Sequence, residues 1–285
     1  MIQNICVIGA GTMGSGIAFT AALSGFETSI FDLNTSMLEK AQSTIRSNFD
    51  FLVAKQKLSQ DKANELYETI LFLSEEKDCK ADLIIEAIVE KMEIKQQLFQ
   101  KLSLINHSNS IFASNTSSLS ISEIQKVVPN PQRVAGLHFF NPAHIMKLVE
   151  VVAGRETSTE TIEALKEVCA KMQKTAVVCR DAPGFIVNRV ARPYYLEAMN
   201  LVKHKRISLE DADLLMEATG FKMGPFRLMD LIGLDVNLAV STSVYHAFDD
   251  ELRFKPEEMQ ITKVAEGNLG KKSGKGFYDY TQSPK

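Results

Sequence analysis

The stretch Ile5-Cys6-Val7-Ile8-Gly9-Ala10-Gly11-Thr12-Met13-Gly14 lies close to the start of the chain, and it decides the fold. The apolar run predicts a buried strand, and the Gly-x-Gly-x-x-Gly turn after it predicts the start of a helix. Gly9 permits a tight turn, Gly11 lets a pyrophosphate approach the backbone, and Gly14 allows the helix to pack closely on the strand. The stretch therefore predicts a dinucleotide-binding site.

A carboxylate completes this pattern. Asp32 follows the apolar pair Ile30-Phe31 and stands eighteen residues after Gly14, where it can accept hydrogen bonds from the adenine ribose hydroxyls. Thr12 and Met13 begin the intervening helix, whose free N–H groups attract phosphates. Because Asp32 would repel a 2′-phosphate, the expected cofactor is NAD rather than NADP.

Composition and charge narrow the class of protein. The 285 residues are about twice a typical domain, and 45% of them are hydrophobic, which is enough for a sizeable core. The formal net charge of −3 gives no general affinity for nucleic acid, so an anionic ligand must meet a local cluster of lysines. No apolar stretch reaches the roughly 18 residues of a membrane span, and no export signal is seen. We expect a cytoplasmic protein with no nucleic-acid or membrane partner.

The cysteines and histidines argue against a metal site. The four cysteines are scattered along the chain, and the five histidines show neither ligand spacing nor an HExxH motif. We therefore expect reduced thiols and no bound metal.

Strand and helix signals alternate as far as about residue 180. Charged, helix-favouring sequence over 35–66, broken near Ser59, predicts a helical hairpin inserted after the second strand. Further helices are expected at 91–104 and 159–172, and further strands at 69–73, 82–87, 111–113, 133–138, 147–152 and 175–179. This alternation predicts a Rossmann-like, mostly parallel sheet covered by helices on both faces.

The pattern changes at Asp181-Ala182-Pro183-Gly184, which predicts a linker. Beyond it helix signals dominate, with an amphipathic run over 186–202 and a cap-like Ser208 followed by an acid three residues later. We therefore expect a dinucleotide-binding domain over 1–183 and a smaller, all-helical domain over 184–285.

Candidate catalytic residues lie in or directly after the middle strands. Asn115 and Ser117 follow one strand, where the side chains of an open sheet face the ligand crevice. His138 ends another strand, and Glu150 lies twelve residues later within a largely apolar one. A buried acid is costly unless it is paired, so His138 is the attractive partner. A histidine held by a carboxylate can remove a proton from an alcohol.

Each candidate also has a plain structural explanation. His138 alone is more often a structural histidine, and Glu150 could hold a backbone group or face solvent on an edge strand. Ser117 could cap the helix that begins near Ser120, and Asn188 could be an ordinary polar position on the first helix of the second domain. Spacing alone leaves these alternatives open.

Over essentially its whole length the chain resembles the 3-hydroxyacyl-CoA dehydrogenases, among them the short bacterial 3-hydroxybutyryl-CoA dehydrogenases. The motifs that carry the resemblance are the glycine turn, Glu86-Ala87-Ile88-Val89-Glu90, Ala113-Ser114-Asn115-Thr116-Ser117-Ser118-Leu119, His138-Phe139-Phe140-Asn141-Pro142, Lys147-Leu148-Val149-Glu150, Pro183-Gly184-Phe185-Ile186-Val187-Asn188-Arg189, Gly224-Pro225 and Gly270-Lys271-Lys272-Ser273-Gly274-Lys275-Gly276-Phe277-Tyr278. So many motifs in one order are highly specific.

The resemblance implies reversible hydride transfer between NAD and C3 of an (S)-3-hydroxyacyl-CoA, with 3-hydroxybutyryl-CoA and acetoacetyl-CoA as the expected pair. It implies that His138 is the general base and that Glu150 orients and stabilises its imidazole. Ser117 and Asn188 would hydrogen-bond the reacting part of the substrate.

The resemblance also implies binding roles. Asn115, Glu90 and Lys95 match family positions near the nicotinamide half of the cofactor, and Lys55 on the hairpin matches the place of the coenzyme A tail. Asn48 stands where relatives often have serine, which leaves the tail contacts open. A homodimer through the helical domain is implied as well.

Two other functions remain open. One is an NAD-dependent dehydrogenase of a free hydroxy or sugar acid, since such relatives share the His and Glu arrangement. The other is a non-catalytic NAD-binding protein, as the crystallins related to this family illustrate. Activity with the acyl-CoA but not the free acid separates the first, and an assay of NADH oxidation separates the second. The acyl chain length, the direction of the reaction and the pathway are not determined by the sequence.

Overall fold

A computed structural model describes residues 2–281 of the chain. These residues form two compact units, one that ends at Ala182 and one that begins at Pro183. Each unit has a hydrophobic core of its own.

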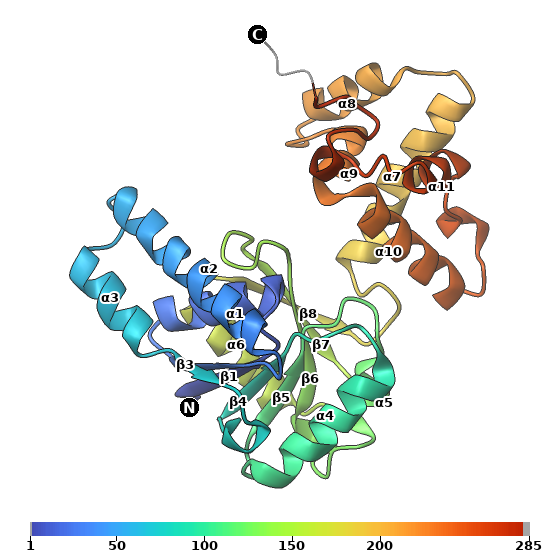
Figure 1. Ribbon diagram of the computed structural model, residues 1–285. Coiled ribbons are helices and arrows are strands. Elements are labelled where there is room, and N and C mark those ends of the chain that lie inside the picture. The colour runs from blue at the N-terminus through green and yellow to red at the C-terminus, as the bar shows by residue number, and fades with distance from the viewer. Residues whose placement is uncertain (1, 282–285) are drawn as a thin grey trace. The chain divides into compact units, whose positions relative to one another are not determined.

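The first unit is built on one eight-stranded sheet (Figure 1). Its strands are β1 (Asn4–Ile8), β2 (Glu27–Phe31), β3 (Leu71–Leu73), β4 (Leu83–Glu86), β5 (Ile111–Ser114), β6 (Val134–Phe139), β7 (Leu148–Ala153) and β8 (Thr175–Arg180). Their order is β3-β2-β1-β4-β5-β6-β7-β8, and all neighbours are parallel except β6 and β7. The predicted mostly parallel sheet is confirmed, with small shifts at the strand ends.

Helices cover both faces of this sheet. α1 (Thr12–Leu23) and α6 (Thr159–Lys171) pack on one face, and α4 (Met92–Ile105) and α5 (Ile121–Gln125) lie on the other (Figure 1). Because the strands from β1 to β6 run parallel, their carboxyl ends and the loops that follow them meet at one edge of the sheet. Ligand crevices of doubly wound sheets form at this edge, where the strand order reverses between β1 and β4.

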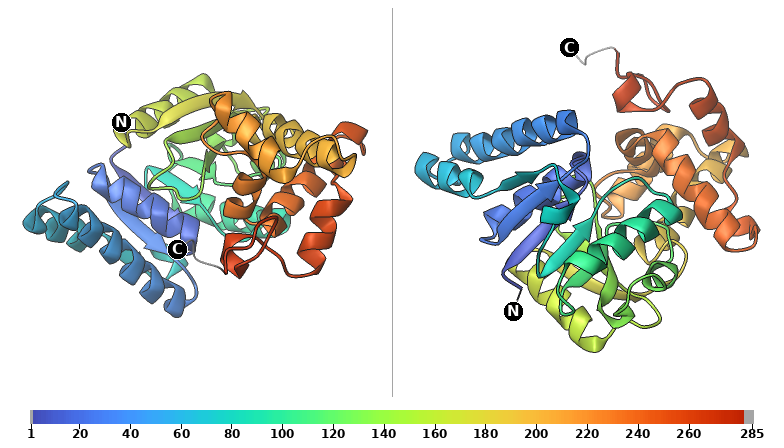
Figure 2. Two further views of the ribbon diagram at one scale, coloured as in Figure 1. Left: turned by 90° about the horizontal axis from the view of Figure 1, so that it is seen from above. Right: turned by 60° about the horizontal axis from the view of Figure 1, so that its bottom comes forward.

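The predicted helical hairpin is present. α2 (Thr35–Ala54) and α3 (Gln60–Glu68) begin at side-chain caps from Asn34 and Ser59, and the hairpin projects from the β3 side of the sheet (Figures 1 and 2). Phe49 anchors it, because this side chain is fully buried and its ring centroid lies 4.8 Å from that of Phe19 on α1.

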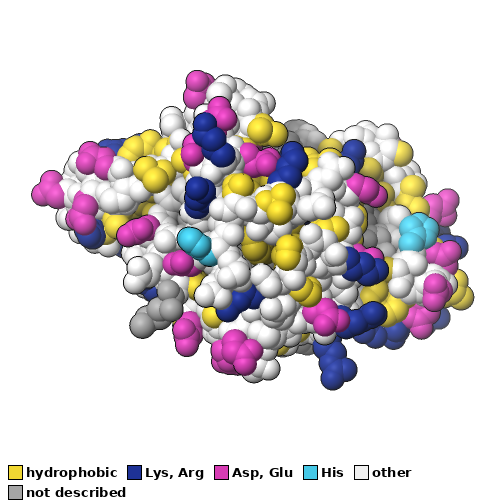
Figure 3. Space-filling view, turned by 90° about the horizontal axis from the view of Figure 1, so that it is seen from below, with side chains coloured by type: hydrophobic (Ala, Val, Ile, Leu, Met, Phe, Trp, Pro, Cys, Tyr) yellow, Lys and Arg dark blue, Asp and Glu magenta, His cyan; other side chains and the backbone are white. Residues whose placement is uncertain are grey.

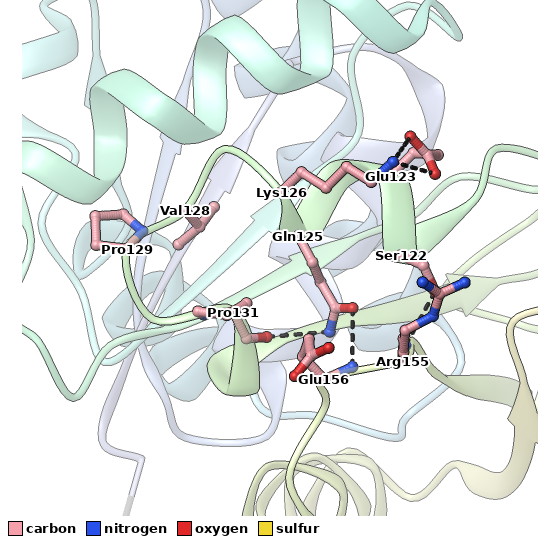
Figure 4. Close-up of a pocket in the computed structure, with 9 residues that line it drawn as sticks. All are labelled: Ser122, Glu123, Gln125, Lys126, Val128, Pro129, Pro131, Arg155 and Glu156. Atoms are coloured by element: carbon pink, nitrogen blue, oxygen red, sulfur yellow. Dashed lines mark hydrogen bonds and ion pairs between the residues drawn. The ribbon is translucent and has the colours of Figure 1, made fainter.

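A buried glutamine fixes the start of β6. Gln125 is 2% exposed, and its Nε2 donates to the Val134 carbonyl at 3.0 Å and to the Thr157 hydroxyl at 2.8 Å. Figure 4 shows Gln125 in a pocket of about 320 Å³ that Lys126 and Arg155 also line. The polar atoms of Gln125 are hydrogen-bonded within the protein, so this side chain serves the packing that positions β6.

Acidic and basic side chains are interspersed over the face of the protein in Figure 3. Among residues 2–281, no helix combines the length and the apolarity that a bilayer crossing requires.

The second unit is helical, as predicted. Its helices are α7 (Val187–Lys203), α8 (Leu209–Ala218), α9 (Pro225–Ile232), α10 (Leu234–Ala247) and α11 (Glu258–Ala265) (Figure 1). Ser208 caps α8 by accepting the Asp211 N–H at 3.0 Å, in agreement with the cap signal in the sequence. The core of this unit is formed by Tyr195, Leu196, Met199, Ala212, Phe226, Met229, Leu234 and Phe277.

Asp230 ties the last described segment to this core. Its carboxylate is fully buried and accepts the N–H of Phe277 and of Tyr278, both at 2.9 Å, and the hydroxyl of Tyr280 at 3.0 Å. Asp213 is also fully buried and accepts the Tyr278 hydroxyl at 2.7 Å. Two buried acids thus hold the segment that contains Phe277, Tyr278 and Tyr280 against the rest of the second unit.

Candidate active site

The turn after β1 leaves open space where a pyrophosphate would lie. Gly9 has φ +105°, and an added Cβ there would lie 2.7 Å from the Ala87 carbonyl oxygen. A Cβ on Gly14 would lie 1.7 Å from the carbonyl oxygen of Gly9, so no side chain fits. A Cβ on Gly11, in contrast, would meet nothing within 4 Å. Because no side chain caps α1, its first N–H groups remain for an anionic ligand.

Asp32 lies directly after β2, beside a small and largely apolar cavity. Its Oδ2 accepts the Ala10 N–H at 2.8 Å and its Oδ1 accepts the Asn34 N–H at 2.9 Å, which fixes the carboxylate in place. The cavity measures about 190 Å³ and is lined mainly by apolar side chains, among them those of Ile88 and Leu98. An apolar wall beside a fixed carboxylate suits an adenine ring and its ribose, so the residues present fit NAD.

His138 and Glu150 form a buried pair. The antiparallel register of β6 and β7 sets the two residues directly opposite each other, and Nδ1 of His138 lies 2.7 Å from Oε2 of Glu150. The histidine is 7% exposed and the glutamate 1%. Because β7 lies between β6 and β8, the alternative of a solvent-facing edge strand for Glu150 is wrong.

The loop after β5 is held by specific hydrogen bonds. Asn115 accepts the N–H of Phe139 at 2.8 Å, which fixes the backbone next to the catalytic candidate. Ser117 donates its N–H to Glu90 at 3.1 Å. α5 is capped by Ser120, so the alternative in which Ser117 caps that helix is wrong.

A buried ion pair that the sequence did not predict lies near this loop. Lys95 is 1% exposed, and its Nζ lies 2.6 Å from Oε1 of Glu86, which is fully buried, and 3.2 Å from Oε2 of Glu90. Glu86 ends the apolar strand β4 much as Glu150 lies within a largely apolar strand. A buried acid needs a partner, so the position of Glu86 at the end of an apolar strand is the sequence signal for this pair.

The remaining predicted residues lie apart from this group along the chain. Lys55 is the C-cap of α2, and its Nζ lies 5.6 Å from the ring centroid of Phe51. Asn188 lies in the first turn of α7, in the second unit, where its carbonyl accepts a hydrogen bond from Arg192 at 3.1 Å. Among residues 2–281, no group of three or more His, Cys, Asp or Glu side chains could hold a metal ion.

The strand order and the glycine turn place the first unit in the class of dinucleotide-binding proteins with a Rossmann-like sheet. Comparison with known families narrows this class. Residues 4–182 match the 3-hydroxyacyl-CoA dehydrogenase NAD binding domain, and residues 184–280 match the C-terminal domain of the same family. The chain therefore belongs to the 3-hydroxyacyl-CoA dehydrogenase family.

Individual relatives match along nearly all of the chain. A 3-hydroxyadipyl-CoA dehydrogenase from Escherichia coli is 43% identical over 98% of this chain, although the chain spans only 59% of that protein. A probable 3-hydroxybutyryl-CoA dehydrogenase from Bacillus subtilis is 40% identical over 99% of this chain and 98% of its own length. The crystal structure of an (S)-3-hydroxybutyryl-CoA dehydrogenase from Ralstonia eutropha superimposes with a TM-score of 0.94 at 34% identity, covering 99% of this chain and 100% of that one.

Proposed function

We propose that the chain interconverts (S)-3-hydroxyacyl-CoA and 3-ketoacyl-CoA with NAD as cofactor, and that 3-hydroxybutyryl-CoA and acetoacetyl-CoA are the substrate pair. The observation that carries this proposal is the buried pair of His138 and Glu150, 2.7 Å apart on the sheet that bears the glycine turn. The family match and the names of the relatives support the acyl-CoA substrate.

His138 moves the proton in this proposal. Glu150 engages Nδ1, so Nε2 is the ring nitrogen that takes the proton of the 3-hydroxyl. The imidazolium that forms is stabilised by the adjacent carboxylate, and it returns the proton when the ketone is reduced. NAD, when bound, supplies the hydride acceptor for the hydrogen on C3.

Other residues bind the cofactor and orient the substrate. The glycine turn and Asp32 hold the cofactor in the first domain, 1–183, and Ser117 donates a hydrogen bond to the reacting oxygen of the substrate. Asn188 belongs to the second domain, 184–285, and contributes a further hydrogen bond. Lys55 meets the phosphates of the coenzyme A tail on the helical hairpin.

The test is a steady-state assay of NADH oxidation with acetoacetyl-CoA, with longer 3-ketoacyl-CoAs and with free acetoacetate. We expect turnover with the thioesters, highest for acetoacetyl-CoA, and none above background with the free acid. The variant His138→Gln is the matched control for contaminating activity. Turnover of the free acid at a similar rate would assign the chain to the hydroxy-acid dehydrogenases, and a chain that binds NADH without turnover would be a binding protein.

We also propose a homodimer that forms through the second domain. Several of its large apolar side chains are about half exposed and offer surface that a second copy could cover, among them Leu214, Leu215, Phe221, Leu231 and Val236. Light scattering should give twice the chain mass of 31.7 kDa. We propose a cytoplasmic location as well, on the ground that the cysteines are scattered along the sequence rather than spaced as a disulfide framework.

A further inference from the structure

Two carboxylates share one ammonium group at the carboxyl ends of β4 and β5. Oε1 of Glu86 lies 2.6 Å from Nζ of Lys95 and also accepts the N–H of Ile88 at 2.8 Å. Oε2 of Glu86 accepts the hydroxyl of Ser114 at 2.6 Å. Glu86, Lys95 and Ser114 are each at most 1% exposed, so this charge pair is shielded from solvent.

The second carboxylate of the group reaches the surface. Glu90 is 38% exposed at its side chain, and its Oε2 lies 3.2 Å from Nζ of Lys95. Its other oxygen accepts hydrogen bonds from the side chain of Thr116 and the backbone of Ser117. Burial raises the pKa of Glu90, but the charge of Lys95 and the hydrogen bonds outweigh it, so the pKa lies below its ordinary value. With all three side chains ionised, as their ion pairs favour, the group of Glu86, Lys95 and Glu90 carries a net charge of −1.

This charge lies on the side of the crevice where the nicotinamide belongs. Ile8, Glu86 and Ser114 are neighbours in register, so the group stands at the same level of the sheet as the glycine turn. Asp32 marks the adenosine side, after β2, and the pyrophosphate lies over the start of α1 between the two sides. The other half of a dinucleotide must extend over β4 and β5, where Glu90 is exposed.

We propose that Glu86 is a positioning residue that sets the preference of the site for oxidised over reduced cofactor, an inference that rests on the proposed NAD-dependent function. The oxidised nicotinamide ring carries a positive charge and the reduced ring is neutral. A net negative group beside the ring stabilises the oxidised form selectively. Glu86 acts by neutralising Lys95, which leaves the charge of Glu90 uncompensated toward the ring, and without Glu86 the group would be neutral.

The test compares the dissociation constants of NAD⁺ and NADH for the full chain, the first by titration calorimetry and the second by cofactor fluorescence. Glu86→Gln removes one charge and keeps the shape of the side chain. We expect the preference for NAD⁺ over NADH to fall by roughly 3- to 30-fold, because an interaction across a few ångströms of protein is lost. A loss of structure would weaken both ligands together and leave the ratio of their dissociation constants unchanged.

Two further variants separate charge from packing. The double variant Glu86→Gln/Lys95→Met restores a net charge of −1, and its ratio should return to within about twofold of the wild-type value. Ser114→Ala removes a partner of Glu86 at constant charge, and it should leave the ratio unchanged. Should Glu86→Gln not fold, Glu90→Gln removes the same unit of charge at a more exposed position and should shift the ratio in the same direction.

An unchanged ratio in a Glu86→Gln variant that still binds both cofactors with wild-type strength would overturn the proposal, and so would an unchanged ratio in Glu90→Gln or an equal shift in Ser114→Ala. The proposed function is scored separately, by the turnover of acetoacetyl-CoA by the wild-type chain. A wild-type chain that turns over this substrate while its variants keep the wild-type ratio would remove only the role of Glu86.

Discussion

The two units both bury carboxylates, but they satisfy them with different partners. In the first unit, Glu150 lies 2.7 Å from a histidine and Glu86 lies 2.6 Å from a lysine. In the second unit, Asp230 accepts two backbone N–H groups and a tyrosine hydroxyl, and it forms no ion pair with a cation of the described residues. Asp213 accepts a backbone N–H and the hydroxyl of a tyrosine, and its nearest cation, the half-exposed Arg227, lies 3.9 Å away.

This difference separates two uses of the same chemical group. Backbone amides hold a fixed protonation state, and burial together with the neighbouring acids raises the pKa of Tyr278 and of Tyr280. The backbone amides and the tyrosine hydroxyls therefore remain neutral. The acids that accept their hydrogen bonds stabilise the fold. Histidine, in contrast, can change its charge. The buried pair of Lys95 and Glu86 contributes to the electrostatic potential of the proposed cofactor site. Predictions for the two kinds of buried acid consequently concern different measurements.

The largest effect is expected at His138 and Glu150. His138→Gln keeps a polar side chain but cannot take the substrate proton, so kcat should fall by roughly 100- to 10,000-fold with NADH binding nearly intact. Glu150→Gln should also lower kcat severely, because the charge that stabilises the imidazolium is lost. The measurement is steady-state kinetics with acetoacetyl-CoA, together with NADH titration.

The double variant tests whether the pair acts as one unit. Since either substitution disables the same device, the double variant should be little worse than His138→Gln alone. Fully multiplicative losses, or near-normal turnover of either single variant in a folded protein, would show that this assignment is wrong.

The next effect is on stability, at Asp230. Asp230→Ala leaves two buried N–H groups and a hydroxyl without their acceptor, which should lower the free energy of unfolding by about 2–4 kcal/mol. Glu210→Gln, at an exposed acid in the first turn of α8, is the matched control and should cost under about 1 kcal/mol. Denaturant unfolding of the full chain measures both. A kinetic defect in Asp230→Ala at full stability would break the distinction between the two kinds of acid.

Asp32 sharpens the comparison, because it has backbone partners like Asp230 but lies half-buried beside the proposed cofactor site. The wild-type chain should prefer NADH to NADPH, and Asp32→Ala should narrow that preference by about 10- to 100-fold, mainly through weaker NADH binding. The values of kcat/KM with the two cofactors measure it. Higher efficiency of the wild-type chain with NADPH would contradict the proposed cofactor.

The smallest effect is expected at Lys55, a charge on the hairpin rather than in the sheet. Lys55→Ala should raise the KM for acetoacetyl-CoA a few-fold, and more at low salt than at high salt, because the contact is a screened charge pair. A truncated pantetheine thioester, which lacks the nucleotide phosphates, is the control and should show little change. An equal loss with both substrates would place the role of Lys55 elsewhere.

Local sequence was sufficient to predict much of the first unit and one helix start in the second. The glycine turn, the acid after β2 and the alternation of strands and helices depend on residues close together in the chain, so their spacing predicts the Rossmann-like sheet directly. Gly14 is an example, because the Gly9 carbonyl that excludes its side chain lies only a few residues earlier, in the same turn. The hairpin of α2 and α3 and the Ser208 cap follow from equally local signals.

Only the tertiary structure decided which charged groups meet. His138 and Glu150 are paired because β6 and β7 run antiparallel in one register, and a shift of one residue would turn the glutamate to the other face of the sheet. Glu86 and Lys95 meet across a strand and a helix. The family resemblance points to Lys95 near the nicotinamide, but nothing in the sequence points to Glu86 as its partner. Periodicity indicates which face of a helix or strand is apolar. The partner of a buried charge depends on strand order, strand direction and register, which the packing of the whole unit sets.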